Sequence, residues 1–166
     1  MTAAGWTTTP NGRFQQCRID QLAGPLAEAL AWLIMQSSDR RAFVVVECIE
    51  VHVNDETGKR WTVERFVQFC SVNEPGWLLF DMPIGQLTDD EQVRLPRSLG
   101  DRVETTLVDE ETGEEQFPPL VCISKRVSES LEGVRLARLA LQQVMQFPDD
   151  RVVTVSMQEG EPGGQN

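Results

Sequence analysis

The spacing of apolar residues changes along the first half of the chain. Between Leu22 and Met35 the large apolar residues recur every three or four positions, which predicts an amphipathic α-helix. The segments 43–53 and 61–72 are instead rich in Val, Ile, Phe and Trp, as β-strands are. The polar segment between them ends near Gly58, a residue suited to a positive φ, so we expect a β-hairpin.

The pairing within this hairpin follows from the length of its loop. A three-residue loop at 56–58 would place Val53 opposite Trp61 and collect the apolar side chains on one face. The same pairing puts Arg65 diagonal to Glu47. We therefore expect these two side chains to form a partly buried ion pair.

Similar patterns predict the rest of the domain. Thr88 and Glu91 form the capping-box sequence of a short helix, which Pro96 must end or kink. The other expected elements are a strand at 77–81, a second hairpin from 102–108 and 117–124, a helix capped by Ser128 and stopped at 147–150, and a final strand at 151–157. The order α-β-β-β-α-β-β-α-β predicts an α+β fold, with an antiparallel sheet of about five to six strands and flanking helices.

Length and composition indicate one domain. The chain has 166 residues, of which 40% are hydrophobic and 25% charged, as in an ordinary folded domain. Its two ends are rich in Gly, Pro, Thr and polar residues. We therefore expect a flexible N-terminal segment at 1–19, a single α+β domain at 20–157 and a disordered tail at 158–166.

The charge of the chain excludes some partners. A net charge of −11 at pH 7 disfavours nucleic acids and anionic membranes, because both are bound through Lys and Arg. The longest strongly apolar run, at 26–35, is half a membrane span, and the first residues lack the order of a signal peptide. We expect a cytoplasmic protein that binds neither nucleic acid nor membrane.

Acidic residues gather in the turn of the second hairpin. The turn carries Asp109, Glu110, Glu111, Glu114 and Glu115, and a three-residue loop would set Glu110 opposite Glu114. Because Ca²⁺ takes six to eight oxygen ligands, these carboxylates could form a weak calcium site, although the EF-hand order is missing. A solvated acidic turn is the other interpretation. Four of eight residues match the first hairpin's turn, which indicates one turn type used twice.

The sequence offers no recognisable catalytic motif. His52 is the single histidine, and Cys48 precedes it by four residues in one strand, about 13 Å away, so the two cannot form a dyad. Hydrolase, zinc-protease, dinucleotide and P-loop motifs do not occur. The four cysteines lie too far apart in the sequence for a zinc or redox motif and are expected to be structural thiols. We expect neither enzymatic activity nor a cofactor.

Large aromatic side chains indicate a protein partner. Trp32, Trp61 and Trp77, with a last helix that is apolar on two sides, offer more apolar surface than the expected sheet and helices cover. We expect a homodimer or a partner protein, with these tryptophans as candidate binding residues.

Five short segments within residues 20–157 carry a family resemblance. They are LAEAL at 26–30, FVQF at 66–69, WLLFD at 77–81, LTDDEQ at 87–92 and the Phe-Pro end of the last helix at 147–148. In their order the chain resembles the type III secretion chaperone-like proteins, including the TY-Chap group. It departs from the group at 98–101, which reads SLGD where L-G-W is often found.

The resemblance implies a small acidic bacterial protein, often dimeric, that binds a partner polypeptide without catalysis or cofactor. We therefore expect a non-catalytic, chaperone- or adaptor-like protein-binding module. The residues leave two alternatives open: an acidic calcium-binding protein that uses the 109–115 loop, and an enzyme of unrecognised type.

Overall fold

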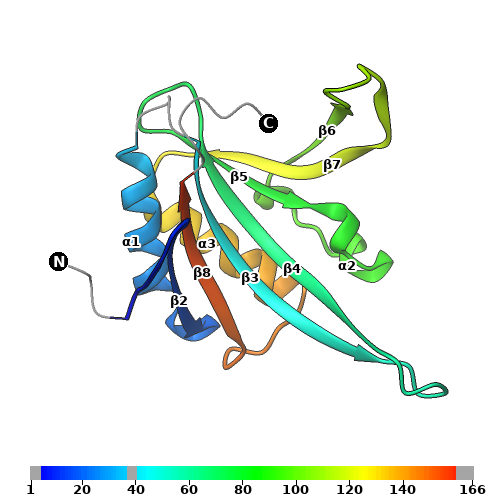
Figure 1. Cartoon of the computed structure of the whole chain (residues 1–166). Coiled ribbons are helices and arrows are strands. Elements are labelled where there is room, and N and C mark those ends of the chain that lie inside the picture. Colours follow the sequence, from blue (N-terminus) through cyan, green and yellow to red (C-terminus); the bar gives the residue numbers. More distant parts are fainter. Residues whose placement is uncertain (1–4, 37–40, 160–166) are drawn as a thin grey trace.

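The computed structural model describes residues 5–36 and 41–159, which fold into one antiparallel sheet with helices packed against it (Figure 1). The eight strands are β1 (Thr7–Thr9), β2 (Gly12–Arg18), β3 (Ala42–Val53), β4 (Arg60–Ser71), β5 (Leu78–Pro83), β6 (Asp101–Val108), β7 (Glu115–Val127) and β8 (Val152–Glu159). Their order across the sheet is β1-β2-β8-β3-β4-β5-β7-β6. The α+β class is confirmed, but the sheet has more strands than the five to six expected.

The two additional strands come from the N-terminal segment. Residues 7–18, which we expected to be flexible, form β1 and β2, and β2 pairs with β8 along its whole length. The chain approaches β8 closely at Gly12, where a Cβ would lie 1.9 Å from the carbonyl oxygen of Met157. The sequence of this hairpin has no strong apolar alternation, so the strands could not be predicted from it. The hairpin is held in the sheet by the pairing of β2 with the distant strand β8. Of the expected tail at 158–166, residues 158 and 159 end β8 and the others lie outside the described residues.

Two long helices cover one face of the sheet. Helix α1 (Ala23–Ile34) lies beside α3 (Ser130–Arg138), which continues as a π-helix over Leu139–Val144 (Figure 1). Helix α3 begins two residues after the expected cap, Ser128. Gln146 adopts a positive φ just after the π-helix, so the helix ends where the sequence predicted.

The hydrophobic core lies between these helices and the sheet. Phe69 of β4 and Phe80 of β5 are fully buried, with ring centroids 5.4 Å apart. Gly133 of α3 lets the helix approach closely, because a Cβ there would lie 2.5 Å from Leu30 and 3.2 Å from Phe69. The close contact joins α1, α3 and β4 in one core.

The short helix α2 (Asp89–Val93) begins with the predicted capping box. Thr88 accepts a hydrogen bond from the backbone N–H of Glu91, and the Glu91 carboxylate accepts one from the N–H of Thr88. The helix ends before Pro96, as expected. Short 3-10 turns occur at Ile19–Gln21, Ile84–Gln86 and Arg97–Leu99.

The expected register of the first hairpin is wrong by one residue. Val53 pairs with Arg60, because the loop has four residues, 55–58, closed by a hydrogen bond from the N–H of Asn54 to the carbonyl oxygen of Lys59. A shift of one residue turns each side chain of β4 to the opposite face of the sheet. Arg65 therefore faces the helices, and its expected pair with Glu47 does not form.

The second hairpin repeats this turn, as the sequence predicted. Asn54 and Asp109 each accept hydrogen bonds from two following backbone N–H groups. Gly58 and Gly113 take nearly the same positive φ, 69° and 71°. One local sequence pattern thus makes the same turn at two places in the sheet.

Candidate functional site

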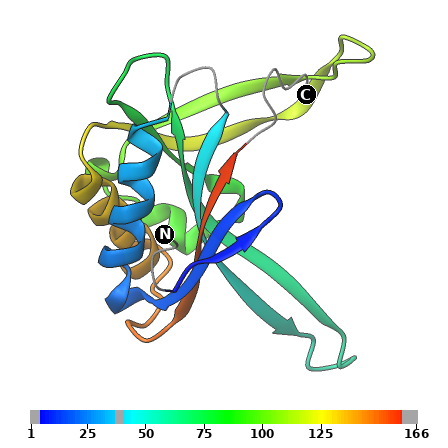
Figure 2. The same cartoon turned by 60° about the vertical axis from the view of Figure 1, so that its left-hand side comes forward.

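The two faces of the sheet differ in what covers them. On β3, Val44 and Val46 point toward the helices and are fully buried, whereas Val45 and Glu47 point the other way and are only partly buried. Helices α1, α2 and α3 pack on the first face, which we call the helix face. No helix of the described part packs on the second, which we call the open face (Figure 2).

Strand register determines which side chains share the open face. One row across the sheet holds Phe14, Ser156, Val45, Gln68, Asp81, Ser124 and Asp101. The next row holds Gln16, Thr154, Glu47 and Phe66. The open face therefore mixes apolar side chains with hydroxyl, amide and carboxylate groups, which is the composition of a surface that meets water or a polar partner.

Two hairpins extend beyond the body of the sheet. β3 pairs with β8 only as far as Glu47, and β4 pairs with β5 only from Gln68 onward, so residues 48–65 form a two-stranded ribbon, the β3–β4 arm. Likewise β7 pairs with β5 only from Cys122 onward, which leaves residues 104–121 as the β6–β7 arm. Figure 2 shows both arms projecting on the side away from α1 and α3.

Most of the exposed hydrophobic side chains lie on these arms. Eight of the fourteen exposed large hydrophobic residues in the described part belong to them: Ile49, Val51, Val53 and Trp61 on the β3–β4 arm, and Leu107, Val108, Phe117 and Leu120 on the β6–β7 arm. A two-stranded ribbon alone is marginally stable, and clustered exposed apolar residues mark interaction sites. The arms are therefore the strongest candidate for a binding surface.

A groove separates the two arms. It has a volume of about 500 Å³ and is lined mainly by apolar residues, among them Val63 and Phe66 of β4 and Leu120 of β7. Gln86 takes the place of a strand beside β4, because its side-chain amide donates to and accepts from the backbone of Phe66, at 2.6 and 2.7 Å. Beyond Phe66 no described strand pairs with this edge of the arm.

Buried charges hold the base of the β3–β4 arm. Arg65 is 5% exposed, and its guanidinium lies 2.5 Å from the carboxylate of Glu91. Arg151 donates a hydrogen bond of 3.0 Å to the carbonyl oxygen of Ile49. The ring of Phe147 lies near both guanidinium groups, at 5.8 Å from Arg65 and 5.5 Å from Arg151. The contacts tie the arm to α2 and to the end of the last helix.

Glu91 joins the capping box to this charge cluster. Burial acts to raise the pKa of its carboxyl, but the hydrogen bond from the N–H of Thr88 and the hydrogen bond and charge of Arg65 outweigh burial and hold the pKa below its ordinary value. The sequence revealed the capping box but not the ion pair, because Arg65 and Glu91 are brought together only by the tertiary fold.

The three candidate tryptophans do not form one surface. Trp32 is partly buried against the core, whereas Trp61 and Trp77 are exposed. Trp61 lies on the β3–β4 arm. Trp77 directly precedes Leu78, which pairs with Ser71 at the other end of β4. Ser71 is ten residues beyond Trp61, so the two tryptophans are about 33 Å apart. Of the three, only Trp61 belongs to the arms.

The described residues that could carry covalent chemistry are poorly placed for it. His52 is exposed, and its ring stacks on that of Trp61, with centroids 5.6 Å apart. The four cysteines are free. Burial first, and the Asp81 carboxylate second, raise the pKa of Cys122 and raise that of Cys70 to about 11. A high pKa keeps these thiols protonated, which suits a structural role.

The acidic turn is built around one of its carboxylates. Hydrogen bonds from the backbone N–H groups of Thr112 and Glu111 lower the pKa of Asp109. The residue opposite Glu114 is Asp109, so the expected pair of Glu110 with Glu114 is wrong. Within the described residues no group of three or more His, Cys, Asp or Glu side chains is placed to hold a metal ion. The weak calcium site at 109–115 stays a prediction.

We expect Asp109→Asn to retain the thermal unfolding midpoint of the parent and Asp109→Ala to lower it. Asn54 holds the twin turn through the same two hydrogen bonds, so an amide oxygen can replace the carboxylate. Because the pKa of Asp109 is lowered by folding, the carboxylate stabilises the turn above about pH 3.9, and this stabilisation fades as the pH falls through the folded-state value. Circular dichroism melts at pH 7 and pH 3 would measure both effects. Equal losses for both variants would contradict this account of the turn.

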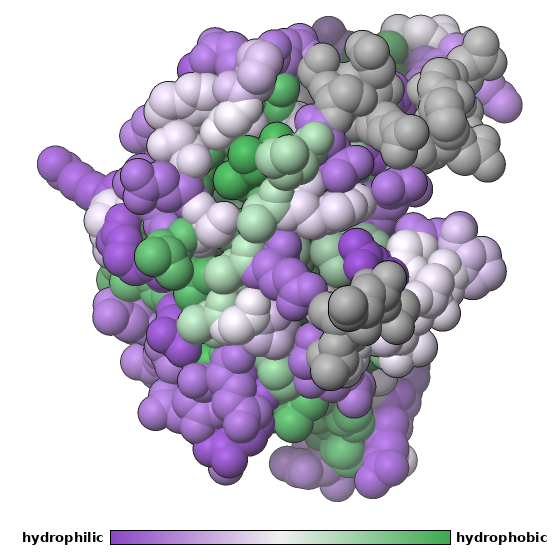
Figure 3. Space-filling model, turned by 90° about the vertical axis from the view of Figure 1, so that its left-hand side faces the viewer, coloured by the Kyte–Doolittle hydropathy of each residue, from purple (hydrophilic) through white to green (hydrophobic). Residues whose placement is uncertain are grey.

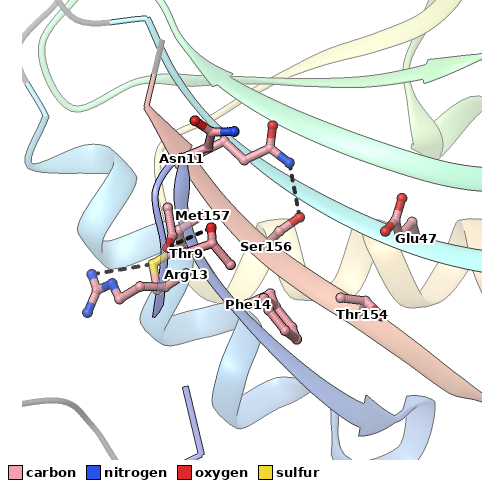
Figure 4. Close-up of a pocket in the computed structure, with 10 residues that line it drawn as sticks. Thr9, Asn11, Arg13, Phe14, Glu47, Thr154, Ser156 and Met157 are labelled. Carbon is pink, nitrogen blue, oxygen red and sulfur yellow. Dashed lines mark hydrogen bonds between the residues drawn. The ribbon is translucent and has the colours of Figure 1, made fainter. Parts of the chain in front are cut away.

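The described part of the chain also has hollows outside the arms. One, of about 410 Å³, lies where β2, β8 and β3 meet and is lined by Phe14, Thr154, Ser156 and Glu47 among others (Figure 4). Figure 3 views the side of α1 and shows a broken band of hydrophobic surface among hydrophilic residues. The second hollow, of about 510 Å³, lies between the start of α1 and the last helix and includes Leu131.

No protein-family model, curated protein or solved structure matches the chain. In the described ranges, none of the helices is both long enough and apolar enough to cross a membrane.

Proposed function

We propose that the protein is a non-catalytic, chaperone- or adaptor-like module that binds another polypeptide through its two arms and the groove between them. The observation that carries this proposal is the concentration of eight of the fourteen exposed large hydrophobic residues of the described part on two ribbons that project from the sheet. Soluble proteins rarely expose clustered apolar residues without a partner for them.

The free edge of β4 adds a second argument. Natural proteins usually shorten, charge or cover such edges, since an unpaired strand can recruit another chain. In β7 the two residues Pro118 and Pro119 remove N–H donors, whereas β4 between Arg60 and Arg65 contains no proline. The β4 edge is thus open to backbone pairing with a partner strand.

The proposed partner includes a second copy of the chain. The resemblance of the sequence to the chaperone-like proteins implies a dimer. Burying the arms of two copies against each other would cover apolar surface that one copy leaves exposed. Sedimentation at micromolar concentration measures this: a species of about twice 18.7 kDa is expected.

The experiment that tests the function is capture of partners by arm variants. Val51→Ser and Phe117→Ser, at residues 61% and 78% exposed, should each reduce the amount of partner captured from lysate of the source cells at least several-fold. Val93→Ser and Leu131→Ser are matched controls, because these residues are 85% and 72% exposed but lie outside the arms.

The controls separate binding from general loss of surface hydrophobicity. All four variants should keep the unfolding midpoint of the parent within experimental error, since exposed side chains contribute little to stability. Equal capture by the arm variants and the parent would refute the proposal. The proposal would also be refuted if the control variants lost as much partner capture as the arm variants.

A further inference from the structure

Negative charge is concentrated at the centre of the open face. Three neighbouring strands place a carboxylate there, Glu47 on β3, Glu64 on β4 and Asp81 on β5, and Asp101 adds a fourth on the edge strand β6. The arginines that strand register places on the open face lie at its margins. They are Arg18 and Arg126, each paired with an acid of its own, and Arg60 near the tip of the β3–β4 arm. The part of the face formed by β3, β4 and β5 therefore attracts cations.

Glu47 is an uncompensated charge in this region. It is partly buried, and neither it nor Glu64 has an ion-pair or hydrogen-bond partner within the described residues. Burial first, and repulsion from Glu64 second, raise the pKa of the Glu47 carboxyl. An unpaired carboxylate in this position destabilises the folded protein, and such residues are often retained for binding.

The two carboxylates are each beside a hollow. Glu47 lines the one of about 410 Å³, together with the Phe14 ring and the Ser156 hydroxyl (Figure 4). Glu64 lines the groove of about 500 Å³ between the arms, together with Phe66. An aromatic ring, a hydroxyl and a carboxylate are groups that hold an ammonium or guanidinium head, and apolar walls fit its aliphatic stem.

The spacing of Glu47 and Glu64 matches an extended chain. Ile49 is the direct partner of Glu64, so Glu47 and Glu64 are diagonal neighbours about 7 Å apart. In an extended chain, side chains two residues apart leave the same side about 6.7 Å from each other. Two basic residues separated by one position would therefore meet both carboxylates.

A second copy of the chain does not fit this surface. An isologous contact would bring Glu47 and Glu64 against their own copies, and like charges held together are destabilising. The sequence also contains no pair of Lys or Arg residues separated by one position. The occupant must therefore be a different chain that supplies positive charge.

We propose that the open face binds an extended, basic segment of a partner protein, with two Lys or Arg side chains separated by one residue at Glu47 and Glu64. This inference rests on the proposed protein-binding function and names the chemistry of the partner. The two carboxylates would select this basic strand, whereas the arms remain available for the contact between two copies proposed above.

The test uses a labelled nine-residue peptide of alternating threonine and lysine as the probe. Fluorescence anisotropy should show binding to the full chain that weakens as salt rises, and none for a peptide with glutamate in place of lysine. The double variant Glu47→Gln, Glu64→Gln should bind the lysine peptide at least tenfold more weakly, because it loses two charge-assisted contacts. It should unfold at a temperature no lower than the parent does, since no partner inside the protein is lost.

The variant Glu110→Gln, Glu114→Gln is the matched control. It removes the same charge from the exposed acidic turn and should keep the affinity of the parent. If both double variants weaken binding equally, the affinity for the peptide depends only on the net charge of the protein, and the inference is wrong. Absence of binding to the parent would also overturn it. The proposed function would survive either result if the arm variants still lost partner capture.

Discussion

Replacing Arg65 by methionine is expected to lower the free energy of unfolding by about 3–5 kcal/mol at pH 7. The guanidinium is buried between Glu91, at 2.5 Å, and Glu50, at 3.7 Å, and it lies over the ring of Phe147. Methionine fills much of the same volume, so the loss comes mainly from leaving the Glu91 carboxylate buried without a counter-charge. Urea unfolding followed by tryptophan fluorescence would measure it.

The loss of unfolding free energy in the Arg65→Met variant should depend on pH. Folding lowers the pKa of Glu91, so its contribution is fully present above about pH 4.3 and is lost as the pH falls through the folded-state value. Without Arg65, burial acts to raise the pKa of the Glu91 carboxyl. At low pH this carboxyl is protonated and neutral, so the absence of the Arg65 charge no longer destabilises the protein. The difference in stability between parent and variant should therefore shrink below about pH 4.3.

Arg126→Met is the control for this prediction. Arg126 also forms an ion pair of 2.5 Å, with Glu74, but both side chains are about half exposed, so the loss should stay near 0–1 kcal/mol. A comparable loss in the two variants would contradict the view that burial of the Arg65 pair decides its importance. Because Arg65 lies at the base of the β3–β4 arm, its variant should also capture less partner than the Arg126 variant.

Phe69→Ala is expected to destabilise the protein by about 3–5 kcal/mol. Its ring is fully buried, packs on Phe80 and lies beneath Gly133 of α3, so the substitution leaves a cavity where α1, α3 and β4 meet. Thermal or urea unfolding would measure the loss.

Phe117→Ala removes the same atoms from a ring that is 78% exposed on the β6–β7 arm. Its stability should stay within about 0.5 kcal/mol of the parent. We expect Phe69→Ala to lose stability and Phe117→Ala to lose partner binding. If Phe117→Ala also lost several kcal/mol, the arm would be part of the folding core and not a binding surface.

Local sequence determined the elements whose signals lie within a few residues. The capping box of Thr88 and Glu91, the turn used at both Asn54 and Asp109, and the stop after the last helix all formed as predicted. Each depends on hydrogen bonds between neighbours in the chain, so residue type and spacing were sufficient.

The tertiary structure decided pairing and exposure. One extra residue in the first loop reversed the faces of β4, and it gave Arg65 a partner 26 residues away in place of Glu47. β1 and β2 joined the sheet through β8, more than 130 residues later in the chain, with little apolar pattern of their own. Such contacts cannot be read from spacing, because their energy depends on which distant segment lies opposite.

Some features of the candidate binding surface also followed from the sequence, whereas others depended on the tertiary structure. The sequence alone determined the acidic charge, the apolar content of the strands and the presence of Trp61 at the end of the first hairpin. Only the tertiary structure decided that β8 and β5 stop short of the hairpin ends, which turns ordinary strands into exposed arms, and that Glu47 and Glu64 share an uncovered face. The physical reason is that alternating residues predict two faces for any strand, but which face is buried depends on where the helices pack.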